Sequence, residues 1–317
     1  MKSYYNNDMR KISAFIVFFF ISALLFAEEI KVLSFNMGAR NKTAIQVADM
    51  IKESEADFVF LQEIWVSAPK DEALKKMCAH LGNAEWDFVS TSSYSLKNLV
   101  TIGEESYKSG GNGQNNAILY NKSKISLTNL AETIGFTHFG AVESDFLFDK
   151  NTVILVEFAL KTEPQKKCIA INTHLPYTDK NHRKRDLATL ERLYARYKLK
   201  SAVLIAGDFN YNRRQLTKGN FDFVDGTETH FYDPNFGILT TLSTKGESEV
   251  IFANDYDHFI FNKKIAVKEQ MHRAFSDSIA KSVEQIQFGT ENFTSSTDYR
   301  KAISDHVPIM ITIEILE

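Results

Sequence analysis

The chain has 317 residues, of which 44% are hydrophobic and 24% are charged, and its formal net charge at pH 7 is −3. This length allows one large core or two small ones, and the composition excludes a low-complexity chain, while two cysteines exclude a disulfide framework. A net negative charge lacks the basic footprint of strong nonspecific nucleic-acid binding, so a polyanion would have to be met by a local patch or by a metal ion.

Residues 1–27 have the pattern of a secretory signal peptide. Arg10 and Lys11 precede an apolar stretch from Ile12 to Phe26, and Ala27 closes it. The stretch is shorter than the roughly 20 residues of a membrane span, so a retained anchor is the less favoured alternative. We therefore expect export to a periplasm or out of the cell, with one domain over residues 28–317 because no Pro/Gly/Ser-rich linker divides them.

The first half of the remaining chain alternates between strand and helix patterns. Apolar residues at helical spacing predict helices over residues 43–53 and 71–81. Alternating or continuous apolar runs predict strands over residues 29–37, 56–61, 87–90 and 117–120. Gln62 and Glu63 are expected to end the second strand. A polar stretch over residues 90–116 predicts a long surface loop, a kind of segment that is often functional.

The second half continues the same mixture. It predicts strands over residues 153–160, 168–172, 202–206, 256–261 and 307–315, a basic helix over residues 180–197, and a loop-rich segment over residues 212–255. Continuous apolar strands between helices indicate an α/β fold in which helices cover the sheets. In such folds the functional groups lie at the ends of strands, so we expect several strand ends to meet at one sheet edge.

The clearest such strand end is the stretch from Ala202 to Tyr211. Five small or apolar residues lead into Gly207, and Asp208 and Asn210 follow. If the extended conformation persists, the carboxylate and the amide share one face, and such oxygen ligands suit a hard cation such as Mg²⁺. The alternative interpretation is an ordinary Asx-type turn after a buried strand.

Five other strand ends carry comparable side chains. They are Asn36, the pair Gln62-Glu63, Asn172 with His174, Asp257, and Asp305 with His306. In this order and spacing, together with Asp208 and Asn210, they resemble the endonuclease/exonuclease/phosphatase superfamily from Ile30 to Ile315. The resemblance implies a DNase I-like, four-layered α/β sandwich of two packed mixed β-sheets flanked by helices. It also implies hydrolysis of a phosphodiester by a water molecule with the help of a divalent metal ion.

The resemblance also assigns roles to the residues. Glu63, Asn36 and Asp305 would bind the metal, which we expect to be Mg²⁺, with Mn²⁺ or Ca²⁺ as alternatives. His306 would be the general base or contact the transition state, and Asp257 would orient it. His174 would donate to the phosphate, Asp208 would orient or deprotonate the water, and Asn210 would hold a phosphate oxygen. Each residue also has an ordinary structural alternative, such as a turn, an exposed charge or a half-buried histidine.

Several questions stay open at this point. A secreted nuclease that acts on nucleic acid is the first choice, and a monomer is expected. A sphingomyelinase-like enzyme acting on phospholipid head groups is the second, because residues 221–236 contain five aromatic side chains. A catalytically inactive binding protein on the same scaffold is the third. Cys78 and Cys168 fit either a disulfide or two buried free thiols.

Overall fold

The computed structural model describes residues 28–38, 43–65, 71–90, 114–128, 134–136, 153–177, 180–218, 229–231, 240–245, 249–252, 254–273, 286–288, 291–293 and 296–316. The expected signal peptide, most of the expected long loop and most of the aromatic stretch 221–236 lie outside these residues. Among the residues described, no helix has the length and apolar character needed to cross a bilayer.

Within the described residues, the first sheet has six strands in the order β14-β17-β1-β2-β4-β3. Its centre is β1 (Ile30–Asn36), which pairs in parallel with β2 (Phe58–Trp65) and antiparallel with β17 (Ile309–Ile315). The outer strands β14 (Ile265–Arg273), β4 (Gln114–Asn121) and β3 (Trp86–Ser90) pair antiparallel with their neighbours.

The described part of the second sheet has seven strands, six of them in the order β10-β13-β9-β8-β7-β5. Its centre is the parallel pair of β8 (Glu163–His174) and β9 (Ala202–Asp208), with β13 (Asp257–Asn262) antiparallel to β9. The remaining strands are β7 (Val153–Leu160), β5 (Ile125–Leu127), β6 (Ile134–Phe136) and β10 (Thr229–Phe231).

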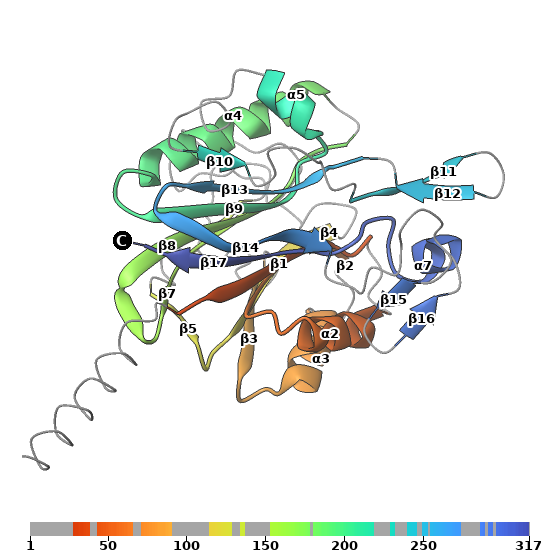
Figure 1. Cartoon of the computed structure of the whole chain (residues 1–317), viewed down its shortest axis with the longest axis horizontal. Helices are drawn as coiled ribbons and strands as arrows, with labels where there is room; N and C mark the ends of the chain where they lie inside the picture. Colours follow the sequence, from red (N-terminus) through yellow and green to blue (C-terminus); the bar gives the residue numbers. More distant parts are fainter. Residues whose placement is uncertain are drawn as a thin grey trace, which may run out of the picture.

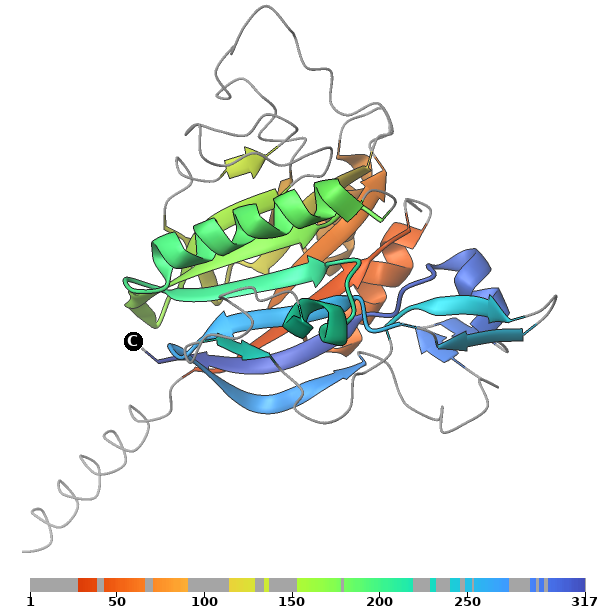
Figure 2. The same ribbon diagram turned by 90° about the horizontal axis from the view of Figure 1, so that it is seen from above.

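Helices cover the outer face of each sheet (Figures 1 and 2). Helices α2 (Ala44–Glu53) and α3 (Glu72–Leu81) pack on the first sheet, and α4 (Lys180–Tyr197) packs on the second. The alternation of side chains along the strands explains why both faces are covered. In β9, Leu204 and Ala206 enter the core between the sheets, whereas Val203 and Ile205 enter the core beneath α4. Three apolar cores thus separate four layers, which confirms the predicted four-layered α/β sandwich.

The later part of the chain contains more regular structure than predicted. The expected loop-rich segment includes α5 (Arg213–Lys218) and the hairpin of β11 (Leu242–Lys245) with β12 (Glu249–Phe252). A second hairpin, β15 (Ile286–Phe288) with β16 (Glu291–Phe293), precedes α7 (Ser296–Ala302). These elements are short, and the β11-β12 hairpin projects away from the two main sheets (Figure 1). Each helix places only one or two apolar side chains in a core, such as Leu216 of α5 and Tyr299 of α7, so their sequences carry little apolar periodicity.

The two cysteines lie in different cores and are free. Cys78 packs between α3 and the first sheet, while Cys168 lies between the two sheets. Burial raises the pKa of the Cys78 thiol to about 12 and raises that of Cys168 as well, so both side chains are unreactive thiols at neutral pH. The structure therefore contains the two buried thiols and not the disulfide.

Gly207 is required where β8 and β9 run side by side. Its φ is +141°, and a Cβ at this position would lie 1.9 Å from the carbonyl oxygen of Thr173. Because the obstacle is the backbone of a central strand, no side-chain movement relieves it. The glycine thus sets how closely the two strands that end in His174 and Asp208 approach each other.

We predict that Gly207→Ala lowers the free energy of unfolding by about 3 kcal/mol or more, at the upper end of the usual cost of overpacking. The matched control is Gly82→Ala, where φ is +109° but no atom lies within 4 Å of the added Cβ. That variant carries the backbone strain alone, about 1–2 kcal/mol. Urea denaturation of both variants measures the difference, and equal losses would contradict the steric argument.

Candidate active site

The predicted site residues meet at one end of the two sheets. Asn36 ends β1 opposite Gln62 of β2, and His174 ends β8 opposite Asp208 of β9. Asp257 begins β13 opposite Asp208. We expected these strand ends to gather at one sheet edge, but they come from both sheets. The sheets pack face to face, so the ends of their central strands lie next to each other.

Glu63 owes its place to a bulge in β2. The pairing with β4 shifts between Leu61 and Ile64, so that Gln62 and Glu63 face a single residue of β4. Glu63 has φ +51°, a conformation that non-glycine residues rarely adopt. The strand therefore does not end at Gln62-Glu63, as we expected, but continues to Trp65 beyond the bulge. Bulges of this kind often direct a side chain into a functional site.

Asp208 uses its two carboxylate oxygens differently. Oδ1 accepts the backbone N–H of Asn210 at 2.8 Å, which closes an Asx turn with Asn210 at φ +50°. Oδ2 accepts the side-chain amide of Asn36 at 3.0 Å and that of Asn210 at 3.3 Å. The turn and the cluster of site residues were alternative interpretations of this stretch, and the structure contains both.

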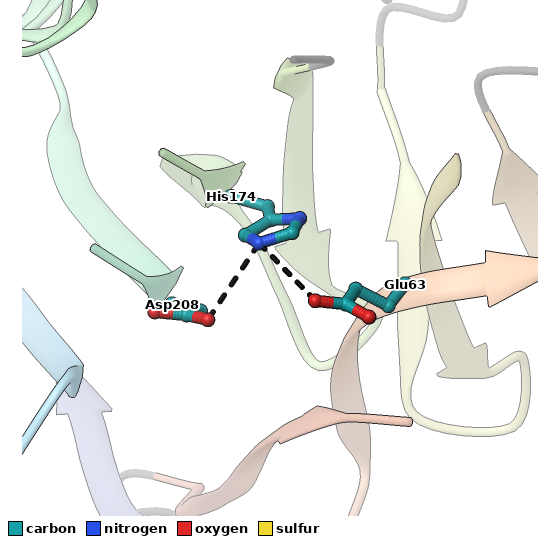
Figure 3. Close-up of side chains that lie close together, drawn as sticks. All are labelled: Glu63, His174 and Asp208. Carbon is teal, nitrogen blue, oxygen red and sulfur yellow. Dashed lines mark ion pairs between the residues drawn. The ribbon is translucent and has the colours of Figure 1, made fainter. Parts of the chain in front are cut away.

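The imidazole of His174 lies between two carboxylates (Figure 3). Its Nε2 is 3.4 Å from Oε1 of Glu63 and 3.6 Å from Oδ2 of Asp208. The amide of Asn36 also joins these carboxylates, since its Nδ2 donates to Glu63 at 3.1 Å and to Asp208 at 3.0 Å. Glu63, His174 and Asp208 thus have three ligand atoms within 4.8 Å of one another, which is close enough to bind one metal ion.

A second close group shares Asp208. The Nδ1 of His306 lies 2.8 Å from Oδ2 of Asp257, and its Nε2 lies 3.5 Å from Oδ2 of Asp208. The structure therefore pairs Asp257 with His306 as predicted. All three side chains are buried, and Oδ1 of Asp257 has no hydrogen-bond partner among the described residues.

Burial and charge shift two pKa values in this group. Burial raises the pKa of Asp208 to about 6, with His306 opposing the shift and Asp257 adding to it. Burial alone would lower the pKa of His306, but the carboxylates of Asp257 and Asp208 raise it to about 10. Without a metal ion, the imidazole is therefore charged at neutral pH.

The loop that carries His306 is fixed to the end of β1. The hydroxyl of Ser304 donates to the carbonyl oxygen of Asn36 at 2.8 Å and accepts the backbone N–H of His306 at 3.1 Å. Asp305 is half-buried next to Gly38, where an added Cβ would lie 3.6 Å from its Oδ1. Asp305 belongs to neither of the two close groups, so its role as a metal ligand stays a prediction.

Gln62 and Asn172 join the two sheets behind the site. Asn172 of the second sheet donates to the carbonyl oxygens of Leu61 and Ala117 in the first sheet, at 2.9 and 2.8 Å. Its own Oδ1 accepts Nε2 of Gln62 at 2.8 Å. Asn172 therefore supports the site and does not line it.

Two residues that sequence reasoning did not select fix the turn after Asp208. Arg183 of α4 donates to the carbonyl oxygen of Asn210 at 2.7 Å and stacks over the ring of Tyr211 at 4.4 Å. Nε2 of His258 lies 2.8 Å from the carbonyl oxygen of Tyr211. The side chain of Arg183 is buried, although the basic residues of a helix usually lie on a solvated face. Its position one turn before the buried Leu187 is the signal that could have found it.

The donor set suits a hard divalent cation. Two carboxylates lie beside an amide and an imidazole, and Mg²⁺ and Mn²⁺ favour such oxygen-rich sites. Asn36 bridges the carboxylates through its nitrogen, while its Oδ1 accepts the backbone N–H of Gly38 at 2.9 Å. The residues present therefore fit a metal ion that would be held mainly by Glu63 and Asp208.

We predict that His306 in the metal-free protein titrates near pH 10 and not near its ordinary 6.5. A raised pKa in the folded state means that the charged imidazole stabilises the fold. That contribution is complete below about pH 6.5 and is lost as the pH rises to about 10. An NMR titration of the imidazole, assigned with His306→Gln, measures the pKa directly. Asp257→Asn should lower it, and a wild-type value near 6.5 would contradict the assigned pairing.

Comparison with known proteins identifies the family. Residues 33–306 match the family described as the Endonuclease/Exonuclease/phosphatase family. A search of curated proteins by sequence gave no significant match.

Solved structures with the same fold include several members of this family. An endonuclease/exonuclease/phosphatase from Bacteroides vulgatus superposes on this chain with a TM-score of 0.62 and 15% sequence identity. The superposition covers 91% of this chain and 99% of the Bacteroides chain. A mannosyl-6-phosphatase from Bacteroides thetaiotaomicron has a TM-score of 0.58 and 16% identity, with coverages of 90% and 99%. The human Nocturnin catalytic domain, solved with a bound sulfate anion, superposes with a TM-score of 0.59 and 13% identity, covering 90% of this chain and 93% of that chain.

At these sequence identities, the structural similarity shows only the fold. The family match over residues 33–306 shows that the chain belongs to the endonuclease/exonuclease/phosphatase family, whose members are hydrolases acting on phosphoester bonds.

Proposed function

We propose that this protein is an exported, Mg²⁺-dependent phosphodiesterase of the DNase I-like type that hydrolyses nucleic acid. The observation that carries the catalytic part of the proposal is the meeting of Glu63, His174 and Asp208 with the Asp257–His306 pair. Such a set contains what phosphodiester hydrolysis requires, namely a place for a cation, a carboxylate for a water molecule and imidazole donors for the phosphate.

The metal ion would be held by Glu63 and Asp208, with Asn36 and Asp305 as the further ligands that we predicted. A bound Mg²⁺ would supply polarisation of the phosphate and stabilisation of its growing negative charge. Asn36 keeps the two carboxylates in place through its hydrogen bonds to both. Asn210 donates to the carbonyl oxygen of Leu175 at 2.8 Å as well as to Asp208, so holding the turn is its first role. Contact with a phosphate oxygen is an additional proposed role.

The positions of the remaining side chains favour one set of roles. Asp208 faces both imidazoles, and it would orient or deprotonate the water molecule, as the family resemblance implies. His306 lies against the carboxylates of Asp257 and Asp208, and a protonated imidazole there would contact the negatively charged transition state, with the general base as the alternative role. Asp257 orients this imidazole through Nδ1, and His174 is a second donor to the phosphate.

Nucleic acid remains the first choice of substrate. Helix α5 begins directly after the Asp208 turn and places Arg213 and the exposed Arg214 near it, where they could meet a polyanion. The aromatic residues that would favour a lipid substrate lie almost entirely outside the described residues. An inactive binding protein is disfavoured, because such a protein usually lacks part of the catalytic set.

We predict that His306→Ala lowers the rate of hydrolysis about 10²- to 10⁴-fold, as expected for loss of a group that takes part in proton transfer or charge stabilisation. The matched control is His80→Ala, because His80 pairs with Asp49 at the protein surface and lies on α3. Steady-state rates with Mg²⁺ measure both variants. An unchanged rate for His306→Ala would remove this residue from the mechanism.

The substrate is tested by assaying plasmid DNA, RNA, sphingomyelin, mannose 6-phosphate and bis-p-nitrophenyl phosphate side by side. We expect cleavage of nucleic acid with Mg²⁺, loss of activity in EDTA, and recovery when Mg²⁺ or Mn²⁺ is added back. Full activity in EDTA would contradict the metal site. Hydrolysis of sphingomyelin without cleavage of nucleic acid would replace the nuclease proposal with a phospholipid phosphodiesterase, and hydrolysis of the sugar monoester alone would replace it with a monoester phosphatase.

Export is proposed from the sequence of residues 1–27 alone. Expression in a bacterium that has a secretory pathway, followed by fractionation and mass spectrometry, tests it. We expect the exported protein to begin close to Glu28. A full-length chain retained in the cytoplasm or the membrane would contradict the proposal.

A further inference from the structure

Thr240 lies beside the Asp257–His306 pair and is buried. Its hydroxyl oxygen accepts two consecutive backbone N–H groups, that of Tyr256 at 3.1 Å and that of Asp257 at 3.2 Å. The same hydroxyl donates to the carbonyl oxygen of Asn254 at 3.4 Å. One side chain therefore fixes the backbone at the point where β13 begins and Asp257 enters the site.

The backbone of the same segment fixes the other member of the pair. The carbonyl oxygen of Thr240 accepts the N–H of Val307 at 2.8 Å, and Thr241 forms an antiparallel bridge with His306. Thr240 thus links the start of β13 to the loop before β17, two segments about 50 residues apart in the chain that belong to different sheets. In the described structure it connects the backbones that carry Asp257 and His306.

This link matters because the pair has little tolerance for movement. The distance between Nδ1 of His306 and Oδ2 of Asp257 is 2.8 Å, and Nε2 must at the same time face Asp208 at 3.5 Å. Oδ1 of Asp257 has no hydrogen-bond partner among the described residues that could hold the carboxylate independently. The orientation of Asp257 therefore depends on its backbone, which Thr240 holds together with the pairing of β13 to β9.

We propose that Thr240 is a positioning residue that sets the geometry of the Asp257–His306 pair through its hydroxyl group. The inference rests on the proposed function for its effect on the reaction rate, but the geometry of the pair can be measured without any substrate. Valine has the shape of threonine without the hydroxyl, and serine keeps the hydroxyl without the methyl group. The two substitutions therefore separate hydrogen bonding from packing.

The experiment compares Thr240→Val, Thr240→Ser and a control, Thr312→Val. Thr312 is also buried, and its hydroxyl donates to Glu269 at 2.9 Å, but it pairs with Lys31 near the start of β1, away from the site. The first readout is the downfield proton NMR signal of the N–H that joins His306 to Asp257, identified by its loss in His306→Ala. The second readout is kcat and KM on whichever phosphoester the protein cleaves.

We expect Thr240→Val to lose or shift the proton signal and to lower kcat about 10- to 100-fold with little change in KM, as for a catalytic group that is misplaced by a fraction of an ångström to 1 Å. Thr240→Ser should restore both readouts, and Thr312→Val should leave them unchanged. If Thr240→Val does not fold, Thr240→Ala is judged by the same readouts.

Three results would overturn the proposal. One is an unchanged signal and kcat in the folded Val or Ala variant. Another is a Ser variant as impaired as the Val variant. The third is an equal loss in Thr312→Val. If the wild-type protein cleaves no phosphoester, the proposed function fails, while the NMR signal still decides the role of Thr240.

Discussion

The buried carboxylate of Asp208 is the group on which the rest of the site depends. A charge in the protein interior is costly unless hydrogen bonds and opposite charges surround it. Here Asn36 and Asn210 donate to it, and the imidazoles of His174 and His306 face it at 3.6 and 3.5 Å. These partners come from both sheets, so the stability of this one ionised group requires the sheets to be packed in register. The same requirement places the remaining catalytic candidates within reach of a shared metal ion.

Two kinds of contact maintain that register. Apolar side chains fill the layer between the sheets, and this layer supplies most of the driving force for their association because burial of apolar surface is the dominant favourable term in folding. Apolar packing alone is weakly directional, however. Asn172 adds direction, since its amide group hydrogen-bonds two carbonyl oxygens of the opposite sheet and Gln62. Gly207 allows the backbones of β8 and β9 to come close enough for His174 and Asp208 to lie side by side.

The sequence was sufficient to predict the central strands, the covering helices and the residues at the strand ends, because apolar runs and helical spacing are local signals. It was insufficient for features that depend on partners distant in the chain. The bulge that turns Glu63 inward is visible only in the pairing with β4. Thr240 lies in a segment without apolar periodicity, and its role appears only when β13 and the loop before β17 lie beside it. Strand β14 mixes charged and apolar residues at a sheet edge, so it lacks the pattern of a buried strand.

The central claim is that strand ends distant in the sequence and from both sheets meet at one site, where Glu63 and Asp208 would hold a single cation. Crystals grown with Mn²⁺ test it most directly, because anomalous scattering locates the ion independently of any assumption about the substrate. The account predicts an anomalous peak in contact with the carboxylates of Glu63 and Asp208, close to Asn36 and on the side of His174. Well-ordered crystals with no peak there, or with manganese bound elsewhere while Glu63 and Asp208 stay hydrogen-bonded to Asn36, would contradict it.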